Sequence, residues 1–156
     1  MPQGPSPEMI AQFHQWFAVE CNNRAWDLAV KTPRTPDESR EMLDAAYAAS
    51  FHWAKIGKPV NIARADMALA HVWAVLGNAE QATKYATQCL EFFQTNPGEE
   101  WDLAFAHAEM AYAAFVRGDK EAHRKHHAEA DRLGQAMKSL EDRSVFMEEF
   151  SRIPKP

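Results

Sequence analysis

Three closely spaced histidines, His123, His126 and His127, are the residues of this chain whose type and spacing most readily suggest chemistry. Positions 123 and 127 lie four residues apart, so on a helix their imidazoles share one face, where two nitrogens can bind one metal ion. With His52 they could complete a three-histidine site. However, basic residues surround the cluster, and the Glu-x-x-His pairs of carboxylate-bridged bundles and the glutamate of metalloprotease motifs are missing. We therefore expect no metal and no other cofactor, and histidines at a surface or an interface.

A second group of polar residues lies on either side of Gly57, with His52 and Trp53 before it and Asn61 and Arg64 after it. If these residues converge at a crevice between two helices, they could hold a small anionic ligand, with arginine binding a carboxylate or phosphate through two nitrogens. The alternative is a local role, in which Asn61 bonds the backbone of the turn and Arg64 bridges to a neighbouring helix. The sequence leaves both interpretations open.

Motifs for covalent catalysis are lacking, and the net charge disfavours nucleic acid as a partner. Ser50 lies among alanines, and neither a Gly-x-Ser-x-Gly motif nor a phosphate-binding glycine loop occurs. Seventeen basic residues against twenty-two acidic ones give a net charge of -5, whereas proteins that follow a phosphate backbone need a large positive surface. We predict a protein that is not an enzyme.

The elements that position these residues are indicated by glycines at regular intervals. Gly57, Gly77, Gly98 and Gly118 are separated by 20, 21 and 20 residues, with alanine-rich sequence in every interval. Glycine commonly ends a helix, so this spacing predicts antiparallel helices that pack as hairpins with a period of 41 residues. We therefore predict an all-α fold in which such hairpins stack.

Capping residues predict where each helix begins. Ser6 and Thr35 each precede a proline, which suits the first helical position, and Glu38 completes a capping box with Thr35. Pro59, Asn78, residues 96–100, Asp119 and Ser139 mark the other starts. The resulting prediction is about seven helices, over residues 7–31, 36–56, 59–76, 79–95, 99–117, 120–137 and 140–152. The fourth should lie on the surface, because only one of its faces is apolar, and the third and fifth should be central.

Residues 63–137 resemble the tetratricopeptide-repeat family. Trp73, Gly77 and Ala82 stand at the spacing of that family's aromatic residue, turn glycine and helix-contact alanine, with Leu69-Ala70 before them and Tyr85 and Leu90 after them. A weaker match begins at Met110, where the alanine arrives one residue early and His123 takes its usual place. The hairpin period is longer than the family's usual one, and the closing proline is displaced to Pro97. The chain also resembles a group of bacterial helical proteins of unknown activity, through Trp26-Asp27-Leu28, Arg34-Thr35-Pro36, His52-Trp53 and Asn61-x-x-Arg64.

The tetratricopeptide resemblance implies a short right-handed solenoid that binds an extended peptide or a partner protein on its concave face. The residues expected in this groove come from the third and fifth helices: Arg64, Met67, His71, Phe105 and Tyr112. The lysines and asparagines with which the family binds peptide C-terminal carboxylates are not at the matching positions. The alternative is that the aromatic residues are core and that Arg64 pairs with an acid. If Arg64 instead faces an open cleft, Arg64→Ala should change stability by no more than about 1 kcal/mol.

The remaining expectations concern organisation and location. We predict a flexible arm over residues 1–5 and one helical-repeat domain over residues 6–153. The N-terminal residues have neither a basic nor an apolar targeting region, and Cys21 and Cys89 have no nearby second cysteine. We therefore expect a soluble cytoplasmic protein with a protein or peptide partner and no membrane contact, with homodimerisation as an option. The alternative function is a small-ligand or metal-binding helical protein with a pocket around His52, Arg64 and the histidines of the sixth helix.

Overall fold

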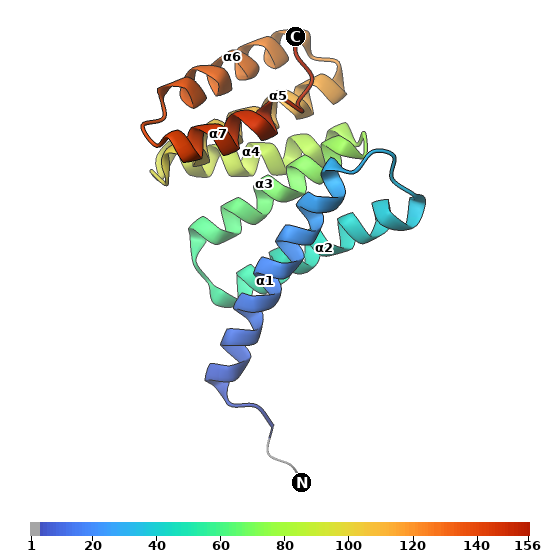
Figure 1. Cartoon of the computed structure of the whole chain (residues 1–156), viewed down its shortest axis with the longest axis vertical. Helices are drawn as coiled ribbons and strands as arrows, with labels where there is room; N and C mark the ends of the chain where they lie inside the picture. The colour runs from blue at the N-terminus through green and yellow to red at the C-terminus, as the bar shows by residue number, and fades with distance from the viewer. Residues whose placement is uncertain (1–3) are drawn as a thin grey trace.

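A computed structural model describes residues 4–156, and this part of the chain is all-α, with seven helices (Figure 1). The helices are α1 (Pro7–Val30), α2 (Pro36–Ile56), α3 (Pro59–Val75), α4 (Ala79–Thr95), α5 (Glu100–Arg117), α6 (Lys120–Ala136) and α7 (Leu140–Phe150). Both the all-helical class and the number of helices predicted from the sequence are confirmed. The predicted boundaries agree closely with the observed ones, and the largest difference is at the end of α7.

The caps form as the sequence predicts, with one exception among the glycines. Thr35 and Glu38 make the reciprocal bonds of a capping box at the start of α2. Gly57, Gly77 and Gly118 have φ near +80°, which glycine adopts without strain, and each follows a helix. Gly98 has no positive φ and precedes α5, where a β-carbon would collide with the side chain of Asp102. Glycine is therefore needed at position 98 because the Asp102 side chain lies close to its backbone, and not because the backbone is left-handed there.

The helices pack as hairpins, α1 with α2, α3 with α4 and α5 with α6. The first helices of these hairpins also contact one another in the order α1, α3, α5, and α7 packs on α5 and α6 (Figure 1). The hairpin of α3 and α4 and that of α5 and α6 begin 41 residues apart, at Pro59 and Glu100. This arrangement is compatible with the predicted stacking of hairpins into a short solenoid.

The core depends on alanines of α3 and α5, whose small side chains let the helices approach closely. Ala70 and Ala113 are fully buried, as are Ala82 and Ala86 of α4. The buried residues of α4 form one stripe, Ala82, Ala86, Cys89, Leu90 and Phe93, so this helix lies on the surface as expected. Burial raises the pKa of the Cys89 thiol, which suits a packing role better than a reactive one. None of the helices of residues 4–156 is long and apolar enough to cross a bilayer.

The C-terminal residues complete the core at the end of α5 and α6. Phe146 and Phe150 of α7 pack with Met137 and with Ile153, which follows the helix. The carbonyl oxygen of Pro154 accepts a hydrogen bond of 2.8 Å from His123 Nε2. At the other end, residues 1–3 of the predicted N-terminal arm lie outside the described residues, and residues 4–5 are exposed.

One carboxyl of the core region makes stability depend on pH. Partial burial raises the pKa of Asp66 in α3 to about 6 from 3.8, and the charge of Lys84 in α4 offsets only part of this effect. The folded protein therefore binds this proton more tightly than the unfolded chain does, and Asp66 lowers stability as pH rises from about 4 to 6. A shift of two units corresponds to about 3 kcal/mol, which solvent exposure reduces to about 1 kcal/mol.

Replacing Asp66 by asparagine should accordingly raise the free energy of unfolding by about 1 kcal/mol near pH 7.5 and have little effect near pH 3.5, where the carboxyl is protonated in both states. Urea denaturation at the two pH values measures the difference. Asp44→Asn changes an exposed carboxylate and provides the control. An equal gain in stability at both pH values would contradict the burial of the Asp66 charge.

Candidate functional site

The first helices of the three hairpins and α7 border an open cavity of about 290 Å³. Its walls are mostly apolar and come from four helices that are widely separated in sequence. The lining residues are Asn22 and Trp26 of α1, Arg64 and Met67 of α3, Trp101 and Phe105 of α5, and Glu149 of α7. We call this space the apolar cavity.

Arg64 is fixed at the wall of the apolar cavity by an ion pair with Asp102 of α5. Its Nε and Nη2 donate to the two carboxylate oxygens over 2.9 and 2.8 Å, and its guanidinium lies 4.4 Å from the centre of the Trp101 ring. Asp102 is fully buried and also accepts a hydrogen bond from the Glu99 backbone N–H. The bond to Asp102 raises the pKa of Arg64. Within residues 4–156, Nη1 of Arg64 has no hydrogen-bond partner, so it remains available as a donor.

Glu149 supplies an acceptor at the same cavity. Its Oε1 pairs with Arg152, whereas its Oε2 is buried and has no partner within residues 4–156. A buried carboxylate oxygen without a partner is unfavourable, and a ligand could bond to it only after the Glu149 carboxylate turns toward the cavity. The apolar cavity therefore combines large apolar walls with two charged side chains, Arg64 and Glu149.

A second cavity, of about 360 Å³, lies next to the first and has polar walls. We call it the polar cavity, and its lining residues are Ala29, Val30, Thr32, Arg34, His71, Val75, Tyr112 and Arg152. The Trp26 ring of the apolar cavity packs against the His71 ring of the polar cavity, with 4.4 Å between the ring centres. The two cavities are thus neighbours along α1, α3 and α5, separated by these two rings, and we use the term groove for the pair of them.

The polar cavity is built around a buried pair of His71 and Glu109. His71 Nδ1 donates to the Glu109 carboxylate at 3.0 and 3.1 Å from the two oxygens, and Glu109 is 1% exposed. Arg34 Nη1 donates to the backbone oxygens of Leu28, Ala29 and Lys31 at the end of α1, while its Nε is buried without a partner in residues 4–156. The two arginines that line this cavity, Arg34 and Arg152, give it a preference for a ligand group that accepts hydrogen bonds.

The five residues predicted for the groove divide between these two cavities. Arg64, Met67 and Phe105 line the apolar cavity, and His71 and Tyr112 line the polar one. Arg64 and His71 each have an acidic partner within the protein, at Asp102 and Glu109 respectively. The structure therefore combines the two interpretations that the sequence leaves open. Arg64 forms an internal ion pair and His71 an internal hydrogen bond, and both residues also border a cavity.

The structure does not bring the four residues around Gly57 together. His52 lies against α1, with its Nδ1 at 2.8 Å from His14 Nδ1 and its ring stacked on Phe17. Arg64 is directed to α5 instead. Neither Trp53 nor Asn61 lines the apolar cavity that Arg64 borders.

Two of the three histidines of α6 share a face as predicted, with 6.0 Å between the ring centres of His123 and His127, whereas His126 faces another helix. His126 faces His107 of α5, with 3.0 Å between their Nδ1 atoms, and His127 packs on the Phe150 ring, while His123 bonds the Pro154 carbonyl oxygen. No contact joins α2 to α6, so His52 is not near them. In the part of the chain that the structure describes, no group of three His, Cys, Asp or Glu side chains could hold a metal ion.

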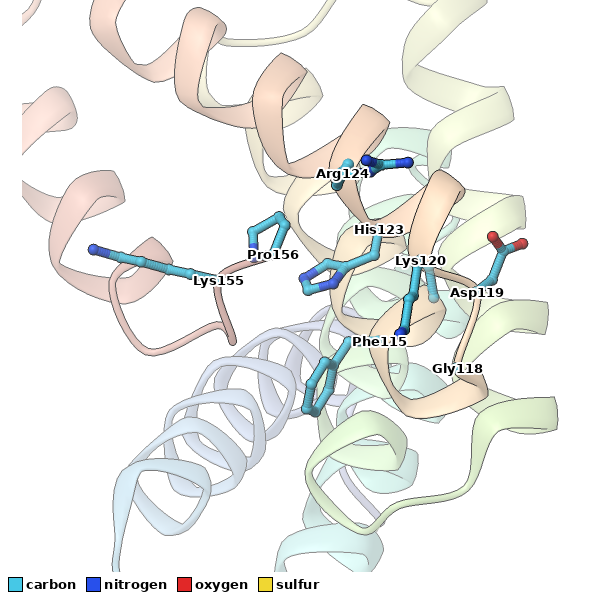
Figure 2. A pocket seen from close by; sticks show the side chains of 9 residues that line it. Phe115, Gly118, Asp119, Lys120, His123, Arg124, Lys155 and Pro156 are labelled. Carbon is cyan, nitrogen blue, oxygen red and sulfur yellow. The ribbon is translucent and has the colours of Figure 1, made fainter.

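A third cavity, of about 590 Å³, lies between the C-terminal residues and the turn from α5 to α6. Figure 2 shows the His123 ring between Phe115 and Pro156, whereas the side chains of Arg124 and Lys155 extend away from it. Its basic side chains are exposed. We therefore regard the groove, which has buried and unpaired polar atoms, as the better candidate site.

Sequence reasoning missed the acidic partners of two groove residues, although a signal for them was present. Asp102 and Glu109 are seven residues apart on α5, as Arg64 and His71 are on α3, so two parallel polar pairs between these helices could have been predicted. Trp26, Trp101 and Glu149 come from elements whose position against the groove has no local signal in the sequence. Comparison of the chain with protein-family models, with curated proteins and with solved structures found no match, so the function is inferred from the groove itself.

Proposed function

We propose that this protein is a non-enzymatic, tetratricopeptide-like scaffold whose groove binds an extended segment of a partner protein. The observation that carries the proposal is the apolar cavity, whose apolar walls are mostly aromatic and whose lining also includes two charged side chains, Arg64 and Glu149. An extended peptide suits such a site, because each of its residues carries one N–H donor and one carbonyl acceptor beside its side chain.

The size of the apolar cavity supports a peptide side chain as its occupant. Its volume of about 290 Å³ is at the lower end of the range for ligand pockets, about 300 to 1,000 Å³, and it accommodates one bulky apolar side chain. Trp26, Trp101 and Phe105 would surround that side chain with aromatic rings. We therefore expect an aromatic or long aliphatic residue at the centre of the bound segment.

The polar cavity specifies the neighbouring part of the segment. Arg34 and Arg152 bring two guanidinium groups to this cavity, together with the hydroxyl of Tyr112. Arg152 is already paired with Glu148 and Glu149, but the buried Nε–H of Arg34 has no partner in residues 4–156. A side chain with acceptor oxygens is therefore favoured here, and a basic one is disfavoured.

Selection from a peptide-display library tests the proposal without knowledge of the partner. The immobilised protein should enrich peptides in which a bulky apolar residue stands close to an acidic one. Fluorescence of Trp26 and Trp101 should change when a selected peptide, made synthetically, is added. Enrichment of lysine- and arginine-rich peptides, or of no consensus at all, would contradict the proposed groove chemistry.

A further inference from the structure

The N-terminal half of α1 exposes large apolar side chains that nothing in residues 4–156 covers. The helix has 24 residues, compared with 17 in α3 and α4, and its beginning projects beyond the other helices (Figure 1). Residues 7–13 are all exposed. We use the term N-terminal apolar face for the side chains of Met9, Ile10, Phe13, Trp16 and Phe17 of α1 together with Phe51 of α2, which are between 43% and 58% exposed.

An uncovered face of this kind is unfavourable at the end of a helical stack. Terminal units of repeat proteins normally present a polar outer surface, because no further unit packs on them. At the C-terminal end, α7 covers α5 and α6 and buries Phe146 and Phe150. At the N-terminal end α1 and α2 have no such covering helix (Figure 1). In addition, two projecting turns of helix gain little stability without packing, because short isolated helices are marginal in water.

The area and the charges of this face suit self-association. Its six large side chains leave roughly 600 Å² of apolar surface exposed per chain, which approaches the 800 Å² or so that each partner contributes to a standard interface. Charged residues near the face include Glu8 of α1 and Lys55 of α2, of opposite sign, so two copies meet no block of like charge.

We propose that a second copy of this chain covers the N-terminal apolar face, in a two-fold symmetric dimer in which the projecting parts of the two α1 helices pack against each other. A two-fold interface uses the same patch on both subunits, so a patch without a strong net charge can be complementary to itself. Asn22 and Trp26, which line the groove, lie on the C-terminal half of α1. The dimer therefore leaves the groove open, and this inference is independent of the proposed function.

Sedimentation equilibrium of the full chain from about 1 to 200 µM tests the dimer. The unmodified protein should reach the mass of a dimer within this range, and Trp16→Glu should weaken the association at least tenfold. Trp16 is 58% exposed, so at concentrations at which both proteins are monomeric this variant should have the circular dichroism spectrum and the melting temperature of the unmodified chain. Leu140→Glu changes the side chain of α7 that is 75% exposed, away from this face, and should leave the dimer intact.

Several results would overturn the inference. The unmodified protein could remain monomeric at all concentrations, or Trp16→Glu could dimerise as strongly as the unmodified chain. Leu140→Glu could also lose as much association as Trp16→Glu does. Co-sedimentation of a monomeric protein with vesicles of phosphatidylcholine and phosphatidylserine, abolished by Trp16→Glu, would instead assign the face to a lipid surface.

Discussion

Replacing Arg64 by alanine is expected to lower the free energy of unfolding by about 3 kcal/mol. The substitution leaves Asp102 fully buried without its opposite charge, and removing one partner of a buried ion pair typically costs about 3 to 5 kcal/mol. We take the lower end of this range because about one third of the Arg64 side chain is exposed. The expected loss of stability exceeds the change of about 1 kcal/mol that the sequence predicts for an arginine in an open cleft. It is larger because Arg64 is paired with Asp102 of α5.

A second substitution isolates the charge as the cause. In the double variant Arg64→Ala with Asp102→Asn, the remaining amide can still accept the Glu99 N–H bond but carries no charge, so part of the lost stability should return. Arg40→Ala removes an exposed arginine and should change stability by less than about 0.5 kcal/mol. Urea denaturation measures all three. If Arg64→Ala were as mild as Arg40→Ala, the ion pair would not be structural.

Replacing Phe146 by alanine is expected to lower the free energy of unfolding by about 3 to 5 kcal/mol, as large-to-small substitutions of buried aromatic residues do. Phe146 is fully buried, with its ring centre 4.9 Å from that of Phe105 and 5.3 Å from that of Phe150. Gly134 of α6 makes room for the ring, because a β-carbon at that position would collide with it. Phe146 thus attaches α7 to both α5 and α6.

The same substitution should also weaken ligand binding, because α7 carries Glu149 to the apolar cavity. Val145, the preceding residue, is 56% exposed, and Val145→Ala is the matched control, with an expected change below about 0.5 kcal/mol. Thermal denaturation gives the stabilities, and hydrogen exchange of α7 shows whether this helix becomes detached. Equal stability of the two variants would show that α7 is not anchored as described.

Helix positions were predictable from the sequence because their signals are local. Thr35 with Glu38, and Asn78 with the N–H of Gln81, form caps within a few residues of chain. The function of Gly98 was not predictable, since its close neighbour Asp102 faces it only after α5 has formed. The third helix is central as predicted, but not all of its apolar side chains are interior. Leu69 is buried, whereas Ile62 is 38% exposed.

The groove could be predicted only as far as α3 and α5. Arg64 and His71 share one side of α3, which is visible in helical periodicity, but their acids come from another helix whose register depends on tertiary packing. The walls from α1 and α7 depend on how the hairpins stack. Trp26 and Glu149 are far apart in sequence, and nothing local indicates that they border one cavity.

The most direct test of the proposed groove is isothermal titration of a display-selected peptide into two variants of α1. One variant carries a phenylalanine on the side of the helix that faces the apolar cavity, and the other carries it on the exposed side. Asn22 lines the apolar cavity, whereas the adjacent Asn23 is exposed. Phenylalanine at position 22 should fill the cavity, so Asn22→Phe is predicted to weaken binding at least tenfold while Asn23→Phe binds as the unmodified protein does. Equal affinity of both variants would contradict the account, because the peptide would then be bound elsewhere.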